Sequence, residues 1–283
     1  MTNLLIALKN LTEHPITDIA TRYRASGRNR VNNMGDALEA YVKDLFCNTL
    51  NIEDRAEKNR MHSEQFSYFG NPKNPPDLMI RGGDAIEVKK IEKLGSSIAL
   101  NSSYPKDKLY SDSSMIIKSC RECEDWSEKD MLYIIGVMQE DRLKALWLIY
   151  GDCYAADKDI YERIQNTISE GVNSLSDVEL SETKELGRVN KVDPLGITYM
   201  RIRGMWAIAN PLYVFDYITD IQMDSELTVN AIMLTEKYNS FPESDRQEIE
   251  NLISDNFKIS DVEIRSPNNP AQLLNAKLIK FTQ

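Results

Sequence analysis

The segment 77–91 constrains the fold of this chain most. It contains two short apolar runs, residues 77–81 and 85–91, which are separated by Gly82-Gly83-Asp84. Two glycines and an aspartate between apolar runs form a tight-turn sequence, so the pattern predicts a β-hairpin. The chain is therefore expected to fold around a β-sheet.

Three charged side chains gather on this predicted hairpin. Residues at i and i+2 on a strand share one face, so Glu87 and Lys89 point the same way while Val88 points to the opposite face. The partner strand of the hairpin can bring Asp77 beside them. The expected result is two carboxylates and one ammonium group on one surface of a sheet.

This combination suits metal-assisted phosphodiester chemistry. Mg²⁺ binds one or two carboxylates together with waters and a substrate phosphate, and it can activate a water and stabilise developing charge. Lys89 could orient or deprotonate the attacking water, or neutralise the phosphate. The alternative is structural: Asp77 as a turn cap, and Glu87 and Lys89 as a solvated strand face.

The remaining periodicities predict a mixed α/β (α+β) fold with a central β-sheet flanked by helices. We expect one domain over residues 1–283, with an exposed, irregular acidic excursion near 173–193. Predicted helices cover 4–11, 34–46, 157–171 and 242–252, with a possible short one near 105–110. Predicted strands cover 64–70, 77–81, 85–91, 131–138, 143–150, 196–206, 262–265 and 274–281.

Glu39 lies on the predicted helix 34–46, beside the apolar stripe rather than opposite it. A glutamate at such a position is either a solvated side chain or an additional acid of the candidate site. Both interpretations stay open from the sequence.

Charge is distributed unevenly along the chain. Residues 1–118 carry 17 basic and 15 acidic residues, whereas residues 119–283 carry 17 and 29. If the protein binds nucleic acid, residues 1–118 are therefore the expected binding region.

No apolar stretch is long enough for a membrane helix and no signal peptide is recognisable, so an intracellular protein is expected. The pair Cys120 and Cys123 is expected to stay as reduced thiols.

Two segments are candidates for DNA contact. The first is 22–30, which holds four arginines in nine residues and is expected to be a loop; the second is the polar stretch just after the Glu87–Lys89 strand. Either segment could instead be a solvated loop. The candidate DNA-binding residues are Arg22, Arg24, Arg28, Arg30, Asn101, Ser102, Ser103 and Lys106.

The pattern Pro76-Asp77…Glu87-Val88-Lys89 resembles the core of the PD-(D/E)xK nucleases, and specifically of Type II restriction endonucleases. The segment 35–39 resembles the amino-terminal acidic helix of this family, and three further segments, 100–106, 146–154 and 201–206, are similar to NgoPII-type enzymes of this group. The resemblance covers about residues 20–215.

The resemblance implies a restriction-endonuclease-like fold, a homodimer and Mg²⁺-dependent cleavage of both strands of duplex DNA at a short palindrome, for which it suggests GGCC. It implies that Asp77 and Glu87 are metal ligands, that Lys89 is the catalytic lysine and that Glu39 is an auxiliary acid. It also implies a prokaryotic, cytoplasmic enzyme with a cognate DNA methyltransferase in the same system.

Two other functions stay open. One is another PD-(D/E)xK nuclease, for DNA repair or junction resolution, and the other is a sequence-specific DNA-binding protein without catalysis. A protein of the second kind would be expected to lack one acid or the lysine, whereas Asp77, Glu87 and Lys89 are all present.

Overall fold

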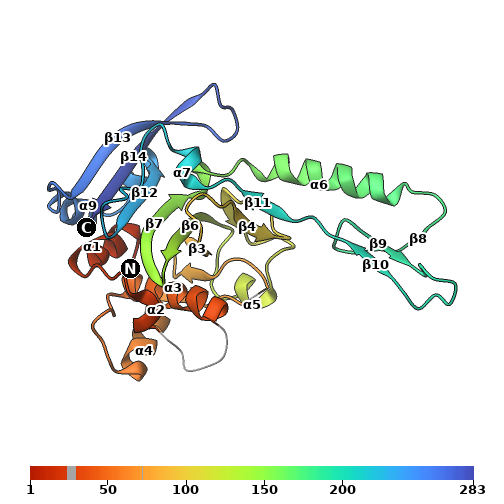
Figure 1. Cartoon of the computed structure of the whole chain (residues 1–283), viewed down its shortest axis with the longest axis horizontal. Helices are drawn as coiled ribbons and strands as arrows, with labels where there is room; N and C mark the ends of the chain where they lie inside the picture. The colour runs from red at the N-terminus through yellow and green to blue at the C-terminus, as the bar shows by residue number, and fades with distance from the viewer. Residues whose placement is uncertain (24–29, 72) are drawn as a thin grey trace.

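A large mixed β-sheet organises the fold in the computed structural model, which describes residues 1–23, 30–71 and 73–283. Its strands run in the order β1-β2-β3-β6-β7-β12-β14-β13, and β5 pairs with β6 beside this path (Figure 1). The strands are β1 (Phe66–Tyr68), β2 (Leu78–Ile80), β3 (Ala85–Ile91), β5 (Lys108–Tyr110), β6 (Glu128–Gln139), β7 (Arg142–Tyr150), β12 (Thr228–Leu234), β13 (Phe257–Arg265) and β14 (Leu273–Thr282).

The hairpin predicted at 77–91 is present. β2 pairs antiparallel with β3, with Leu78 opposite Ile86, and Gly82 takes a positive φ of 63° in the turn between them. β3 then pairs parallel with β6, which forms a second hairpin with β7. Glu87 and Lys89 therefore lie on a strand that is fixed on both sides by sheet hydrogen bonds.

Helices cover the sheet and close its ends. The apolar stripe predicted on 34–46 is buried in α3, which packs against α1, α2, α4 and strand β3. The helices of the sheet region are α1 (Leu4–Glu13), α2 (Ile19–Arg22), α3 (Arg30–Cys47), α4 (Arg55–Gln65), α5 (Lys118–Arg121), α7 (Pro211–Val214), α8 (Thr235–Ser240) and α9 (Glu243–Glu250), with the 3-10 helix η1 (Gly151–Cys153).

An arm projects from this sheet region (Figure 1). It consists of helix α6 (Lys158–Asn173) and a small antiparallel sheet of β8 (Glu179–Leu180), β9 (Gly187–Asn190) and β10 (Met200–Ile202). A two-stranded sheet, β4 (Ile98–Asn101) with β11 (Trp206–Ile208), lies at its base. We call residues 157–205 the arm.

Several predicted elements are corrected by the structure. The possible helix near 105–110 is strand β5, because Leu109 is fully buried between two half-buried neighbours and the segment pairs with β6. The predicted excursion 173–193 contains β8 and β9 rather than irregular chain, and Leu186, Gly187 and Val189 within it are buried. The predicted strand 196–206 is divided into β10 and β11, which pair with different partners.

Other corrections concern helices and strand limits. The predicted strand 64–70 is shortened to β1, because helix α4 continues to Gln65. The predicted loop 22–30 has helical ends, since Arg22 closes α2 and Arg30 opens α3. Strand β12 was not predicted at all, although its residues are almost all buried at the centre of the sheet.

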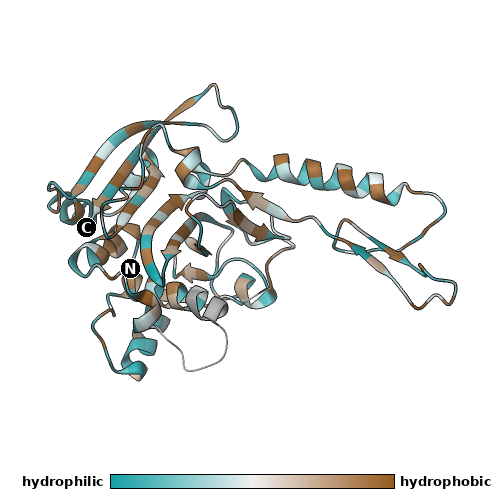
Figure 2. Ribbon diagram, viewed as in Figure 1, coloured by the Kyte–Doolittle hydropathy of each residue, from teal (hydrophilic) through white to brown (hydrophobic). Residues whose placement is uncertain are grey.

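The buried apolar residues form one continuous cluster that includes both hairpins, α1, α3 and the strands β12 to β14. The ribbon coloured by hydropathy shows the apolar residues concentrated in the central strands and alternating with polar residues along α6 (Figure 2). In the parts of the chain that the structure describes, no helix combines the length and apolar character that crossing a membrane requires.

Candidate active site

Three predicted site residues meet at the β2–β3 hairpin. Asp77 directly precedes β2, while Glu87 and Lys89 lie on β3. Lys89 Nζ is 2.5 Å from Glu87 Oε1 and 3.8 Å from Asp77 Oδ2. The amide of Val88 donates a hydrogen bond of 2.7 Å to Asp77 Oδ2, so Asp77 is fixed to the strand that carries the other two. The predicted convergence of the three groups is therefore present in the structure.

Burial makes the carboxylate of Asp77 costly to charge. Burial, and then the neighbouring charge of Glu87, raise the pKa of Asp77 to about 7, although Lys89 and the Val88 amide act in the opposite direction. For Lys89, burial lowers the pKa, but the charges of Glu87 and Asp77 outweigh it and raise the pKa above its ordinary value. Lys89 is therefore an ammonium group at neutral pH, and the cluster favours a further cation beside Asp77.

Glu39 reaches this cluster electrostatically. It lies on α3, half-buried, and forms an ion pair with Lys43, at 2.7 Å, one helical turn further along. Its charge raises the pKa of Asp77 and of Lys89, so it lies near both groups without a direct hydrogen bond to either.

The oxygen atoms of the cluster fit a hard divalent cation. Glu87 Oε2 is buried without a hydrogen-bond partner among the described residues, which is costly unless a cation or water satisfies it. Two carboxylates are the usual protein contribution to a Mg²⁺ site that keeps waters and binds a phosphate. Over residues 1–23, 30–71 and 73–283, no group of three or more His, Cys, Asp or Glu is arranged to hold a metal ion. Any such site would therefore depend on water and substrate oxygens.

A second lysine, Lys106, lies next to Glu87. Lys106 is only 5% exposed, and burial lowers its pKa to about 8, while the charge of Glu87 acts to raise it. Its Nζ donates to Ser103 Oγ and to the carbonyl of Tyr104, the latter at 3.0 Å. Lys106 and Glu87 line the same small hollow. The sequence predicted Lys106 as a DNA-backbone contact and gave no sign that it borders the carboxylates.

Lys106 also forms the inner end of a groove of about 430 Å³ that runs to the base of the arm. The groove contains four lysines, Lys106, Lys108, Lys158 and Lys184, and two acidic residues, Asp112 and Glu162. Lys158 lies over the Tyr110 ring, with Nζ 4.5 Å from the ring centroid. The groove is therefore positively charged and leads directly to the candidate site.

The other predicted DNA-binding residues lie in different surroundings. Asn101 and Ser102 are exposed and Ser103 is half-buried, all next to the groove residue Tyr104. Arg22 is exposed and donates to the carbonyl of Leu50. Arg24, Arg28 and the side chain of Arg30 lie outside the described residues.

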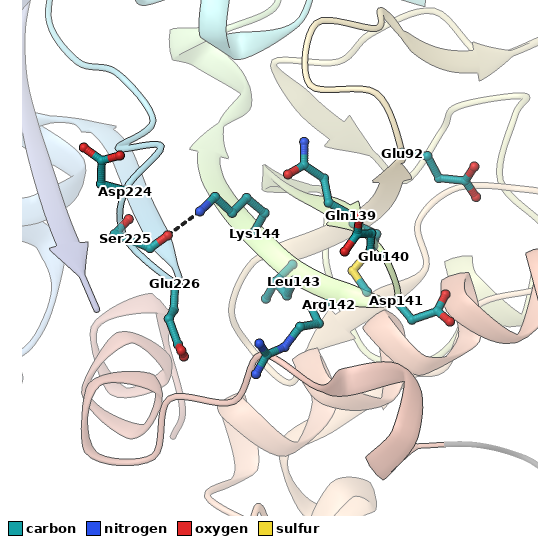
Figure 3. Close-up of a pocket in the computed structure, with 11 residues that line it drawn as sticks. Glu92, Gln139, Glu140, Asp141, Arg142, Leu143, Lys144, Asp224, Ser225 and Glu226 are labelled. Atoms are coloured by element: carbon teal, nitrogen blue, oxygen red, sulfur yellow. Dashed lines mark hydrogen bonds between the residues drawn. The ribbon is translucent and has the colours of Figure 1, made fainter.

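A larger hollow lies away from the carboxylate cluster. It has a volume of about 1,000 Å³ and is formed by the β6–β7 turn, Glu92 and residues 224–226 (Figure 3). Lys144 bridges its two sides by donating to the carbonyl of Ser225. Five acidic and two basic residues line it, so it does not suit a polyanion.

The central mixed sheet, with flanking helices and a carboxylate–carboxylate–lysine cluster on one hairpin, defines a protein of the restriction-endonuclease-like fold class. A family model described as NgoPII restriction endonuclease matches residues 2–265. The chain is also 46% identical, over 280 residues and 99% of both chains, to the Type II restriction enzyme NgoPII of Neisseria gonorrhoeae. No solved structure matches the chain.

The chain belongs to the NgoPII restriction endonuclease family and is a Type II restriction endonuclease. The family and enzyme class predicted from the sequence are thereby confirmed.

Proposed function

We propose that this protein cleaves both strands of duplex DNA at a short palindrome by Mg²⁺-dependent hydrolysis of the phosphodiester. The observation that carries the proposal is the convergence of Asp77, Glu87 and Lys89 on one hairpin. The resemblance to NgoPII-type enzymes makes GGCC the first sequence to test. We also propose that the active form is a homodimer and that a cognate methyltransferase protects the host DNA.

Each residue of the cluster has a distinct role in this reaction. Asp77 and Glu87 would hold Mg²⁺ through their carboxylate oxygens; the buried, unpartnered Glu87 Oε2 supports this role. When bound, Mg²⁺ supplies Lewis-acid activation of the phosphate and the attacking water. Glu39 would add negative charge near the site without binding substrate.

Lys89 would act as a charge rather than as a base. Before Mg²⁺ binds, the charges of Glu87 and Asp77 raise the pKa of Lys89, so at neutral pH it is an ammonium group without a free electron pair. Its ammonium group can instead hold the attacking water by a hydrogen bond and stabilise the negative charge that develops on the phosphate. Removal of Lys89 should therefore affect the rate more than DNA binding.

Plasmid DNA that contains GGCC tests the proposal directly. With Mg²⁺ the purified protein should give discrete fragments, and with EDTA it should leave the plasmid intact. Sequencing of the fragment ends gives the recognition sequence and cut position. Asp77→Asn should abolish cleavage, because it removes one charge of the proposed cation site, and should retain specific binding in a gel-shift assay. Cleavage in EDTA, or an Asp77→Asn variant with near wild-type rate, would contradict the proposed chemistry.

A further inference from the structure

The arm carries most of the exposed apolar surface of the molecule. In the described chain, eighteen large apolar residues are exposed, and eleven of them lie between residues 160 and 205. The most exposed, at 82% and 77%, are Leu195 and Ile197 at the connection between β9 and β10. Soluble monomers rarely expose an apolar patch larger than a few hundred Å². This concentration therefore marks an interaction surface.

Helix α6 presents a regular part of this surface. Ile160, Ile164 and Ile168 are spaced by four residues, so they form one stripe along the helix, and they are 38%, 39% and 46% exposed. We call these three residues the α6 stripe. None of the sixteen residues of α6 is buried, and Figure 2 shows apolar positions recurring along the helix as it leaves the sheet region.

One face of α6 is polar, and the face that carries the α6 stripe is apolar. Lys158, Glu162, Gln165 and Asn166 line the basic groove that leads to the carboxylate cluster. At 100° per residue, Glu162 and Asn166 lie about 160° and Lys158 about 120° from the centre of the α6 stripe, whereas Gln165 lies at the flank, about 100° away. The polar face is thus turned towards the proposed DNA path, and in the described part of the chain the residues of the α6 stripe stay 38–46% exposed.

The charge of the arm favours a protein over DNA as the partner of the stripe. Residues 157–205 contain seven basic and nine acidic residues, so the arm as a whole does not attract a polyanion. Isoleucine side chains also offer no hydrogen bond to a phosphate. A partner that buries the stripe must itself be apolar.

We propose that the α6 stripe is the dimer interface, and that its partner is the same stripe of a second copy of this chain. The proposal rests on the proposed function, because two copies related by a two-fold axis are what reading a palindrome requires. With the axis near Ile164, two antiparallel α6 helices bring Ile160 of one copy against Ile168 of the other. Rows of residues spaced by four are the ridges that pack in the commonest class of helix pairs.

The α6 stripe alone exposes about 1.2 whole side chains, on the order of 200 Å² of surface, so the proposed contact is centred on the stripe and must extend to the other exposed apolar residues of the arm. The exposed fractions of the eleven residues amount to about six whole side chains, on the order of 1,000 Å² of surface when a large side chain is given somewhat under 200 Å². Specific interfaces bury about 800 Å² per partner. The arm can therefore supply a stable dimer contact without any part of the catalytic surface.

Sedimentation without DNA tests the interface. The wild-type protein should be a dimer at micromolar concentration, and Ile164→Glu should raise the dissociation constant of the dimer by about 30-fold or more, because it places a charge at the centre of the buried contact. Ile253→Glu is the matched control: Ile253 is 55% exposed and lies outside the arm, so this variant should remain a dimer. Circular dichroism should show native folding in both variants.

Three results would overturn the interface: a monomeric wild-type protein, a folded Ile164→Glu variant that remains a dimer, or equal weakening by Ile253→Glu. These results are independent of the plasmid assay. If the wild-type protein cleaves DNA and Ile164→Glu stays dimeric, the proposed function holds and the interface is wrong. If the dimer dissociates as expected but no DNA is cleaved, the interface holds and the proposed function is wrong.

Discussion

At the scale of single residues, two lysines next to each other on β3 have opposite surroundings. Lys89 contacts both carboxylates of the cluster, whereas Lys90 lies on the other face of the strand and pairs with Glu92 at 2.9 Å. The period of two in a strand separates them completely. Lys90 therefore serves as an internal control for the role of the Lys89 ammonium group.

We expect Lys89→Ala to lower the cleavage rate roughly 1,000-fold and to change specific DNA binding little, because the lost charge acts on the developing phosphate charge. Lys90→Ala should keep the rate within about threefold of the wild type. Single-turnover cleavage of a GGCC duplex measures the first effect, and a gel shift without Mg²⁺ measures the second. Equal losses in both variants would show that Lys89 has no special role.

The residues of the site differ in how far the sequence could predict them. Asp77, Glu87 and Lys89 were predicted to converge because strand period and a two-glycine turn determine which side chains share a face. Lys106 lies beside Glu87 because the 101–107 loop packs against Tyr133. The Tyr133 hydroxyl accepts a hydrogen bond of 2.7 Å from the backbone amide of Lys106. A local pattern contains no information about such a tertiary contact.

At the scale of elements, a buried polar network joins three helices near the N-terminus. Asp44 on α3 accepts hydrogen bonds from Tyr23, which follows α2, and from Thr49, each at 2.7 Å. Its carboxylate also pairs with Lys58 and His62 on α4, at 2.6 and 3.0 Å. Although burial alone would raise the pKa of Asp44, the hydrogen bonds from His62, Lys58, Thr49 and Tyr23 hold it below its ordinary value of 3.8.

This network should make the fold sensitive to acid. A carboxyl group whose pKa is lower in the folded state stabilises the fold above its unfolded pKa, and this stabilisation is lost as the pH falls through the folded value. Asp44→Asn should therefore lower the free energy of unfolding by about 3 kcal/mol at neutral pH, and the difference from wild type should shrink below pH 3.8. Urea denaturation at several pH values measures both effects.

Asp36→Asn provides the control for this experiment. Asp36 lies on the same helix and is exposed, so its replacement should change the free energy of unfolding by less than about 0.5 kcal/mol. A constant difference between Asp44→Asn and wild type at every pH would contradict the ionised role of Asp44.

The same region shows why some elements could not be predicted. Helix α3 has a strong apolar stripe and was predicted, whereas α4 buries only His62 and is otherwise polar, so it has no apolar period to recognise. Its stability comes from the Asp54 cap and from the Asp44 network, which are contacts rather than patterns. Strand β12 was missed for the opposite reason: it is buried on both faces and shows no alternation.

At the scale of the whole molecule, the basic groove and the carboxylate cluster form one continuous path. The groove lysines Lys158 and Lys184 lie on the arm, and Lys106 lies at the end next to Glu87 of the carboxylate cluster. The acidic balance of residues 119–283 therefore does not prevent binding of a polyanion, because the local groove is basic.

Replacement of both Lys158 and Lys184 by alanine should weaken DNA binding for all sequences alike. Each lost phosphate contact should reduce the slope of log K against log salt by about 0.9. Fluorescence anisotropy at several salt concentrations measures this slope. Lys258→Ala on β13, at the opposite edge of the sheet, is the control and should leave the slope unchanged. An unchanged slope in the double variant would place the DNA elsewhere.

The hydrogen bond from the Val88 amide to Asp77 Oδ2 has a wider consequence. It ties one carboxylate to the main chain of the strand that carries the other, so the spacing of the two acids does not depend on any side chain outside the hairpin. Exchange of the 101–106 loop or of the arm between relatives would leave this spacing intact. A chain built in this way can exchange the segments around the hairpin, over evolution or in the laboratory, while the two carboxylates proposed to bind the metal keep their relative geometry.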